Sequence, residues 1–330
     1  MIGRSRDDLE GLPEHVQESV RRHRRRTAVV LGALGVAVAA LGVLAVLRVG
    51  TGGGEASTAP DTGVLAASAE AVWSWSGPAD CSAGDPPAAL TRRDASGETS
   101  VGTPLRALRA LAVREASLAV LGRDDACLTT LAVSADGGQT WRTSPAPDVV
   151  DVRLLGGGRV LAVRNGATVT EVVEGPPGSL APAGVTCPER QEPRAVGDHG
   201  ERPYLLCEDD PGLLRLLQRS TGGGWEYLTD TRPATGLDGA FRTRDLEVLL
   251  DGPGLLLADD ARCREGALRR TEDGGATWAP LPCPRESLPG AVVLDVALSP
   301  DGEPLLLVLQ GGAAVVVGSD DGGRSWRALE

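Results

Sequence analysis

Lysine is absent from this 330-residue chain, and all 33 of its basic residues are arginine. Isoleucine and phenylalanine occur once each, and the chain has only two tyrosines and three histidines. This usage is typical of GC-rich codons and indicates a bacterium with a GC-rich genome, rather than selection for guanidinium chemistry. The scarcity of histidine and tyrosine limits the catalytic arrangements that the chain can build.

Catalytic and metal-binding motifs are equally scarce. The sequence has no G-x-S-x-G, H-E-x-x-H, Walker-loop or EF-hand spacing, and no C-x-x-C pair that would favour a zinc or redox site. Of the histidines, only His199 lies beyond residue 26. Three acidic clusters are alternatives as calcium or general-acid sites, although loops between strands explain them better: Asp124-Asp125, Glu208-Asp209-Asp210 and Asp259-Asp260. We therefore expect no catalytic residue, no metal and no cofactor.

The one long apolar run lies near the N-terminus, at residues 28–47. Its 20 residues are enough to cross ~30 Å of hydrocarbon at ~1.5 Å per residue. The basic stretch 21–26 precedes it, so the positive-inside rule predicts a cytoplasmic tail at 1–26 and a transmembrane signal anchor at 27–47. A cleaved signal peptide is the alternative, but the run exceeds the usual ~7–15 residues and no A-x-A site follows closely.

The remainder of the chain is expected outside the cell membrane. A Gly-, Ser- and Thr-rich stretch at 48–63 predicts a flexible linker, and residues 64–330 form the extracytoplasmic domain. Residues 1–26 hold 7 arginines and 5 acidic residues, so the other 26 arginines and 40 acidic residues give a net charge of −14. Such an acidic domain repels nucleic acid and anionic lipid, so we expect no nucleic-acid partner.

All six cysteines lie beyond the predicted anchor, which predicts three disulfides in an exported chain. Sequence alone allows fifteen pairings. Cys263 and Cys283 are each ten residues from Asp273, and Cys187 and Cys207 are symmetric about Gly197. If these centres are hairpin turns, the pairs are Cys263–Cys283 and Cys187–Cys207, leaving Cys81–Cys127.

Three stretches are near copies of one another, each with the pattern S/T-x-D-G-G-x-T/S-W. They span residues 134–141, 271–278 and 319–326. The pattern resembles the Asp-box, or bacterial neuraminidase repeat, which marks blades of β-propellers in sialidases, sortilin-type receptors, xyloglucan hydrolases and photosystem-assembly propellers. The matching positions are Asp136, Gly138, Thr140, Trp141, Asp273, Gly275, Thr277, Trp278, Asp321, Gly323, Ser325 and Trp326.

The spacing supports a propeller independently of that resemblance. Trp278 and Trp326 are 48 residues apart, and Trp141 precedes Trp278 by 137, close to three steps of about 46. A degenerate copy at 220–225 occupies one intermediate slot, the other falls near 174–180, and a ragged copy at 94–99 would belong to a first unit. At ~44 residues per blade we expect an all-β, single propeller with six blades, five or seven remaining open.

Short apolar runs between glycines predict the strands of each blade. The last unit is clearest, with strands expected at 291–298, 304–309, 313–318 and 325–329. Residues 149–155, 159–164 and 167–173 repeat the scheme. In the boxes, we expect the aspartates to cap turns and the tryptophans to pack between blades.

The sialidase activity that the resemblance suggests lacks its residues. That family uses a tyrosine nucleophile, acidic residues and three arginines, the first in an F/Y-R-I-P motif before the first box; here only residues 241–244 are similar, and they come two repeats too late. Tyr204 and Tyr227 are the available nucleophiles. Trp73 and Trp75 lie on one side of a strand and either stack on sugar or, the preferred interpretation, pack the first blade.

These observations favour a membrane-anchored propeller that acts as a non-catalytic binding or scaffold module for a cell-envelope protein or glycan. The alternatives are a sialidase-like glycoside hydrolase and an accessory factor that assembles another membrane complex.

Overall fold

The computed structural model describes residues 62–329 except for 79–80, 83–84, 167–169, 189–190, 200–201, 209–213, 221, 228–241, 249–252, 260–262, 264–265 and 274–276. The predicted tail and anchor, 1–47, lie outside the described residues, as does most of the predicted linker. Within the described part of the chain, no helix is long and apolar enough to span a membrane. The first strand begins at Thr62, two residues before the boundary expected for the domain.

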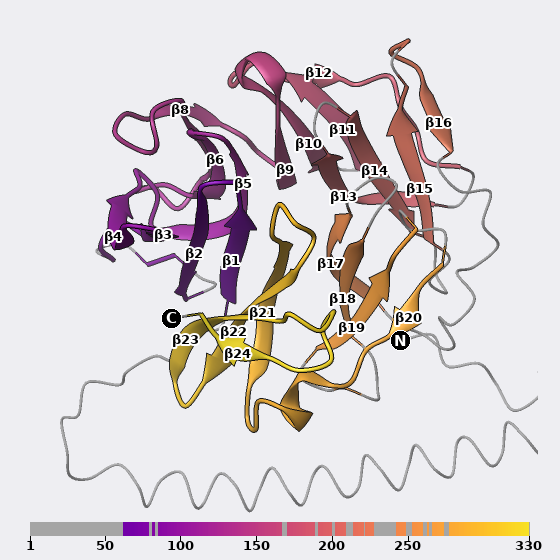
Figure 1. Ribbon diagram of the computed structural model, residues 1–330. Helices are drawn as coiled ribbons and strands as arrows, with labels where there is room; N and C mark the ends of the chain where they lie inside the picture. The colour runs from indigo at the N-terminus through magenta and orange to yellow at the C-terminus, as the bar shows by residue number, and fades with distance from the viewer. Residues whose placement is uncertain are drawn as a thin grey trace, which may run out of the picture. The chain divides into compact units, whose positions relative to one another are not determined.

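Six four-stranded antiparallel sheets follow one another along the chain and are arranged around a centre, so the fold is a six-bladed β-propeller (Figure 1). The expected all-β class and blade number are confirmed. Blade 1 contains β1 (Thr62–Ala67), β2 (Ala71–Gly77), β3 (Ala89–Asp94) and β4 (Gly97–Gly102). Blade 2 contains β5 (Ala107–Arg114), β6 (Ser117–Arg123), β7 (Thr129–Ser134) and β8 (Arg142–Pro145). Blade 3 contains β9 (Val149–Leu155), β10 (Arg159–Asn165), β11 (Thr170–Gly175) and β12 (Ala181–Pro182).

The other three blades repeat this order. Blade 4 contains β13 (Glu192–His199), β14 (Arg202–Glu208), β15 (Leu214–Arg219) and β16 (Trp225–Tyr227). Blade 5 contains β17 (Arg242–Val248), β18 (Gly254–Asp259), β19 (Ala267–Thr271) and β20 (Ala279–Pro280). Blade 6 contains β21 (Val292–Leu298), β22 (Pro304–Gln310), β23 (Ala313–Gly318) and β24 (Arg327–Ala328). Two short 3₁₀ turns, η2 (Gly156–Gly158) and η3 (Pro284–Glu286), complete the described elements. The strands expected in blades 3 and 6 are present, but β24 has only two residues because the box turn extends through Ser325.

The core lies between blades. Each sheet is covered on both faces by its neighbours, so a middle strand such as β6 is buried along five consecutive residues, Leu118 to Gly122. This burial on both faces explains why the strands appear in the sequence as continuous apolar runs rather than alternating ones. One cluster joins blades 2 and 3 through Leu121, Leu131, Val152 and Leu154.

The ring closes without exchange of a strand between its ends. β1 to β4 form blade 1 and β21 to β24 form blade 6, and the inner strand β1 lies beside the inner strand β21. Polar contacts also join these blades: the amide of Leu65 donates to Asp295 Oδ2 at 2.5 Å, and Arg93 donates to the carbonyl of Leu329 at 2.5 Å. Side-chain packing and these bonds therefore hold the first blade to the last.

The antiparallel order within each blade gives the propeller two different faces. The turns between first and second strands and between third and fourth strands lie on one face, which carries the boxes and which we call the box face. The turns between second and third strands and the connections between blades lie on the other. All three disulfides, Cys81–Cys127, Cys187–Cys207 and Cys263–Cys283, have their cysteines at this second end of the strands, which we call the disulfide face.

The three expected disulfide pairs are confirmed, but the reason given for one of them is wrong. The hairpin of β13 and β14 turns after His199, which pairs with Arg202, so Gly197 is not its centre. Cys207 lies opposite Pro193 in that hairpin, and Cys187 comes from the preceding connection between blades 3 and 4. The symmetric spacing about Gly197 is therefore a coincidence of loop length.

Candidate functional site

The box aspartates hold the turns between third and fourth strands. Asp136 Oδ1 accepts hydrogen bonds from the Thr140 amide at 2.9 Å and the Ser134 hydroxyl at 2.7 Å, while Oδ2 accepts from the Thr140 hydroxyl at 2.6 Å. Asp273 makes the same bonds with Thr271 and Thr277, and Asp321 with Ser319 and Ser325. The Thr140 hydroxyl and amide lower the pKa of Asp136 to about 2. The Ser325 hydroxyl and amide likewise hold the pKa of Asp321 below its ordinary value. All three aspartates cap their turns with both carboxylate oxygens already engaged.

The remaining box residues lie against the preceding blade. A Cβ added at Gly138 would lie 2.3 Å from Val101, and one at Gly323 would lie 2.6 Å from Leu281. Trp278 and Trp326 are 5% and 7% exposed in cores shared with the preceding blade, whereas the half-buried Trp141 donates its indole N–H to the carbonyl of Gly102. Gly275 lies outside the described residues.

The degenerate copies occupy the same turn in the other blades. Asp94 accepts hydrogen bonds from the amide and hydroxyl of Ser96 between β3 and β4, and Ser220 donates to the carbonyl of Gly224 between β15 and β16. Blade 3 has lost the motif, and next to the turn it has ion pairs of a buried glutamate instead. Glu174, at the end of β11, pairs with Arg159 at 2.6 Å and with Arg219 of blade 4, which holds its pKa below the ordinary value.

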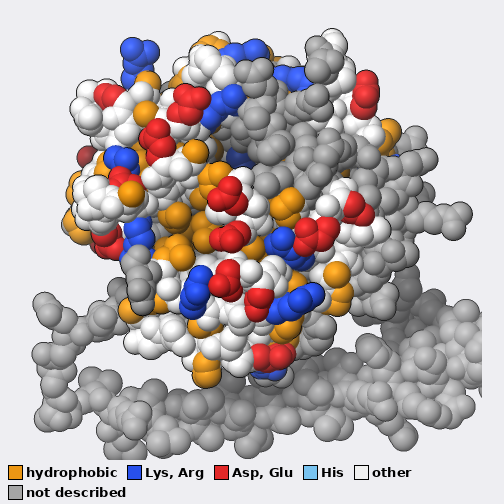
Figure 2. Space-filling model, viewed as in Figure 1, with side chains coloured by type: hydrophobic (Ala, Val, Ile, Leu, Met, Phe, Trp, Pro, Cys, Tyr) orange, Lys and Arg blue, Asp and Glu red, His pale blue; other side chains and the backbone are white. Residues whose placement is uncertain are grey.

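A cavity of about 340 Å³ lies at the centre of the ring, between the inner strands. Its lining residues include three arginines and two aspartates, and they come mostly from the beginning of the inner strands, so the cavity lies toward the disulfide face. They are Thr62, Gly63, Leu65, Arg109, Ala110, Leu111, Val150, Asp151, Arg153, Arg194, Ala195, Leu294 and Asp295. Figure 2 shows a basic side chain recessed near the middle of the face in view, with acidic side chains on the surrounding surface.

β-Bulges place two of these arginines. The register of the inner strand shifts at Arg109 in β5 and at Arg194 in β13, and both residues are exposed. Val150 and Leu294 occupy the same bulge position in β9 and β21, and both line the cavity. A bulge re-aims the extra residue away from the regular pleat, and here it turns the side chain from the interface between blades toward the centre. Arg244 has the same backbone position in β17, although its side chain is not described.

The two aspartates join neighbouring inner strands. Asp151 accepts from the amide of Val196 in the next blade at 2.8 Å and from the amide of Val152 at 2.8 Å. Asp295 accepts from the amide of Leu65, as described above. Arg153, which is 7% exposed, donates to the carbonyl of Val152 at 2.9 Å and lies 3.3 Å from Asp151. Arg194 pairs with Glu208, which is 4% exposed, at 3.1 Å.

The tyrosines that the sequence offered as nucleophiles lie away from this cavity. Tyr204 is fully buried in a core between blades 4 and 5, and Tyr227 is 54% exposed on the outer strand β16. Trp73 and Trp75 are 2% and 8% exposed in the core of blades 1 and 2, so they pack the first blade and offer no sugar platform. His199 belongs to β13, but its side chain is not described.

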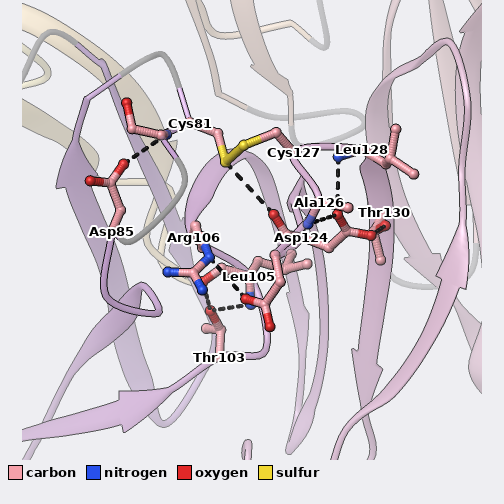
Figure 3. A network of polar contacts seen from close by, with 12 residues as sticks. Cys81, Asp85, Thr103, Leu105, Arg106, Asp124, Ala126, Cys127, Leu128 and Thr130 are labelled. Carbon is pink, nitrogen blue, oxygen red and sulfur yellow. Dashed lines mark hydrogen bonds and ion pairs between the residues drawn. A yellow bond between two sulfur atoms is a disulfide. The ribbon is translucent and has the colours of Figure 1, made fainter.

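The acidic pair Asp124-Asp125 shapes a loop of the disulfide face (Figure 3). Asp124 accepts from the amides of Ala126 and Leu128 and from the hydroxyl of Thr130, and its carbonyl lies 3.7 Å from Cys81 Sγ. Burial alone would raise the pKa of Asp124, but these hydrogen bonds outweigh it and hold the pKa below the ordinary value. Asp125 pairs with Arg106 at 2.9 Å.

The other acidic clusters are only partly described. Glu208 forms the ion pair with Arg194 given above. Residues 209, 210 and 260 and the side chain of Asp259 lie outside the described part of the chain. Among the described residues, no group of three or more histidines, cysteines or acidic residues is placed to hold a metal ion.

Comparison with known proteins identifies a class of fold and no family. No family model and no curated protein matches the sequence. Two lectin structures are similar in fold. SapL1 lectin in complex with α-methyl fucoside has 12% identity and a TM-score of 0.54, and the match covers 83% of this chain and 96% of that one. The fungal lectin from Aleuria aurantia, a six-bladed propeller, has 13% identity and a TM-score of 0.54, and the match covers 81% of this chain and 93% of that one.

A glycoside hydrolase is also similar, at a lower score. The GH74 xyloglucanase from Xanthomonas campestris has 18% identity and a TM-score of 0.48 over 82% of this chain. The chain spans about half the length of that enzyme and of the GH74 enzyme from Niastella koreensis. At these identities the comparisons establish the propeller fold alone.

From the sequence we did not predict the three arginines that line the cavity, Arg109, Arg153 and Arg194. The box copies lie at the opposite end of the blades, and the bulges at Arg109 and Arg194 lack the sequence pattern found at two other bulges. One sequence signal does exist: residues 149–154 and 293–298 share the pattern V-x-D-V-x-L. The first x is the bulge residue, and the aspartate that follows it accepts a hydrogen bond from the next blade.

Proposed function

We propose that this chain is a non-catalytic binding module, carried on the cell membrane by one N-terminal helix, that holds a cell-envelope protein or glycan in its central cavity. In this proposal the propeller is of the Asp-box type and lies outside the cell. The observation that carries it is the cavity itself, where arginines from three consecutive blades meet on rigid inner strands. Concave sites of a few hundred Å³ with a few converging polar groups are the usual place for a ligand.

The arrangement favours binding over catalysis. Its two aspartates accept backbone amide bonds from the next blade, so they hold the ring and are poorly placed to transfer protons to a ligand. Neither tyrosine lines the cavity. A positioned nucleophile or a tuned acid and base is therefore lacking among the described lining residues.

A sialidase-like glycoside hydrolase is the second candidate. The observation in its favour is the group of three cavity arginines, Arg109, Arg153 and Arg194, since that class clamps a substrate carboxylate with three arginines. The role of assembly factor for a membrane complex is a third candidate and would use the same surface.

A panel of fluorogenic glycosides, including a sialoside, separates binding from hydrolysis. We expect the purified full-length chain to release no fluorophore above the level of an Arg109→Gln variant. Turnover that disappears in Arg109→Gln and persists in Arg142→Gln, on the outer strand of the same blade, would establish the hydrolase instead.

A further inference from the structure

We infer that the central cavity binds one carboxylate of a protein segment, an Asp or Glu side chain or a C-terminus flanked by aliphatic residues. The inference rests on the proposed binding function and names the chemistry of its ligand. It depends on three features of the cavity: its charge, the state of its own acids and the apolar residues at its mouth.

The residues that line the cavity include more positive than negative side chains, although the domain as a whole is acidic. Arg109 and Arg194 extend from bulges at equivalent positions of blades 2 and 4, and Arg153 lies on the strand between them. Arginines outnumber carboxylates three to two among the lining residues, whereas residues 27–330 as a whole carry a net charge of −14. A guanidinium presents a planar fork of donors that matches the two oxygens of a carboxylate.

The cavity's own acids are committed to the backbone. Asp151 is bound by the amides of Val152 and Val196, and Asp295 by the amide of Leu65. Glu208 lies behind Arg194 and orients it. Because these carboxylates join the inner strands and pair with Arg153 and Arg194, those two arginines are held in place before a ligand enters. Preorganisation of this kind lowers the entropy lost on binding.

Aliphatic side chains accompany the arginines. Val150 and Leu294 occupy the other two bulge positions that line the cavity, and Val150 is 37% exposed. Leu65 also lines the wall. The described lining contains no aromatic ring on which a sugar would stack, and Thr62 is its one hydroxyl side chain. An acidic residue between aliphatic neighbours complements this mixture better than a carbohydrate or a free phosphate does.

The size of the cavity agrees with a single side chain or chain end. A volume of about 340 Å³ is near the lower end of the usual range for ligand sites, ~300–1,000 Å³. An extended peptide therefore places one acidic group in the cavity while its neighbours contact the aliphatic residues at the mouth.

The test uses the full-length chain in mild detergent and two blocked peptides, acetyl-Gly-Val-Glu-Val-Gly-amide and its Gln counterpart. Calorimetric titration should give at least tenfold tighter binding of the Glu peptide. Arg109→Gln should weaken that binding about tenfold, and Arg194→Gln should do the same, whereas Arg142→Gln should leave it unchanged. Arg109 is exposed, so its variant should keep the wild-type melting temperature, which shows that loss of binding is not loss of the fold.

Other outcomes overturn the inference. Equal binding of the Glu and Gln peptides would remove the carboxylate from the recognition. Glucuronate or inorganic phosphate binding more tightly than the Glu peptide would assign the cavity to a sugar acid or a free anion. If no carboxylate probe binds while the glycoside panel is also negative, this inference fails and the proposed binding function stands; turnover of a glycoside would remove both.

Discussion

At the residue scale, the residues of the box motif stabilise a turn and join neighbouring blades, and their polar atoms are engaged within the turn. Each aspartate accepts hydrogen bonds from donors of its turn, Gly138 and Gly323 allow their turns to approach the preceding blade, and the tryptophan packs between the two sheets. Because all three residues act on the same turn and the same interface between blades, Asp, Gly and Trp recur together at fixed spacing. Where the motif is absent, as in blade 3, an ion pair between the buried Glu174 and Arg219 joins the blades instead.

Trp278→Ala should destabilise the domain by about 3–5 kcal/mol, the usual range for truncating a buried aromatic side chain. Trp278 is 5% exposed and contacts residues of blades 4 and 5, so its removal leaves a cavity between them. Denaturant unfolding of the wild type and the variant measures the difference. Trp141→Ala is the matched control: its ring is only half-buried, so a smaller loss is expected. Unchanged stability in Trp278→Ala would show that this ring does not hold the blades.

Sequence and structure agree most where the information is local. Strands in the last blade could be predicted within one or two residues because glycine turns separate apolar runs, and the blade number followed from the spacing of the boxes. The bulges at Arg109 and Arg194 could not be predicted, because a one-residue shift depends on how the inner strand pairs with its neighbour. The central cavity depends on six such strands meeting, which no local pattern encodes.

At the element scale, the disulfides constrain the loops of one face. Two disulfides each close a loop of 20 residues. The loop of Cys187–Cys207 begins in the connection between blades 3 and 4, and that of Cys263–Cys283 begins in the turn between β18 and β19. Cys81–Cys127, with a separation of 46, joins the loops of blades 1 and 2 and lies within the network of Asp124. The cavity lies toward this same face, at which all three disulfides have their cysteines.

Removal of either type of disulfide should lower stability. The chain-entropy model gives about 3 kcal/mol for a 20-residue loop and somewhat more for the longer one, so Cys81→Ala/Cys127→Ala should destabilise at least as much as Cys263→Ala/Cys283→Ala. Paired substitutions avoid leaving a free thiol. Denaturant midpoints of the two variants and the wild type, all kept oxidised, measure the effect. If neither midpoint moves, the loops are held by their hydrogen bonds and not by the disulfides.

At the scale of the whole molecule, the ring has a direction. Every inner strand begins on the disulfide face, and the first of them, β1, starts at Thr62, which itself lines the cavity.

The topology itself is the last prediction. The arginines at 21–26 should retain the N-terminus in the cytoplasm, because positive charges next to an apolar segment resist translocation. In intact spheroplasts, added protease should therefore remove a tag placed after Glu330 and leave a tag at Met1 protected, with both tags cleaved after detergent lysis. The reverse pattern would invert the orientation. A mature N-terminus mapped beyond Leu47 would instead show cleavage of the leader, and the propeller would then reach its partner as a secreted domain.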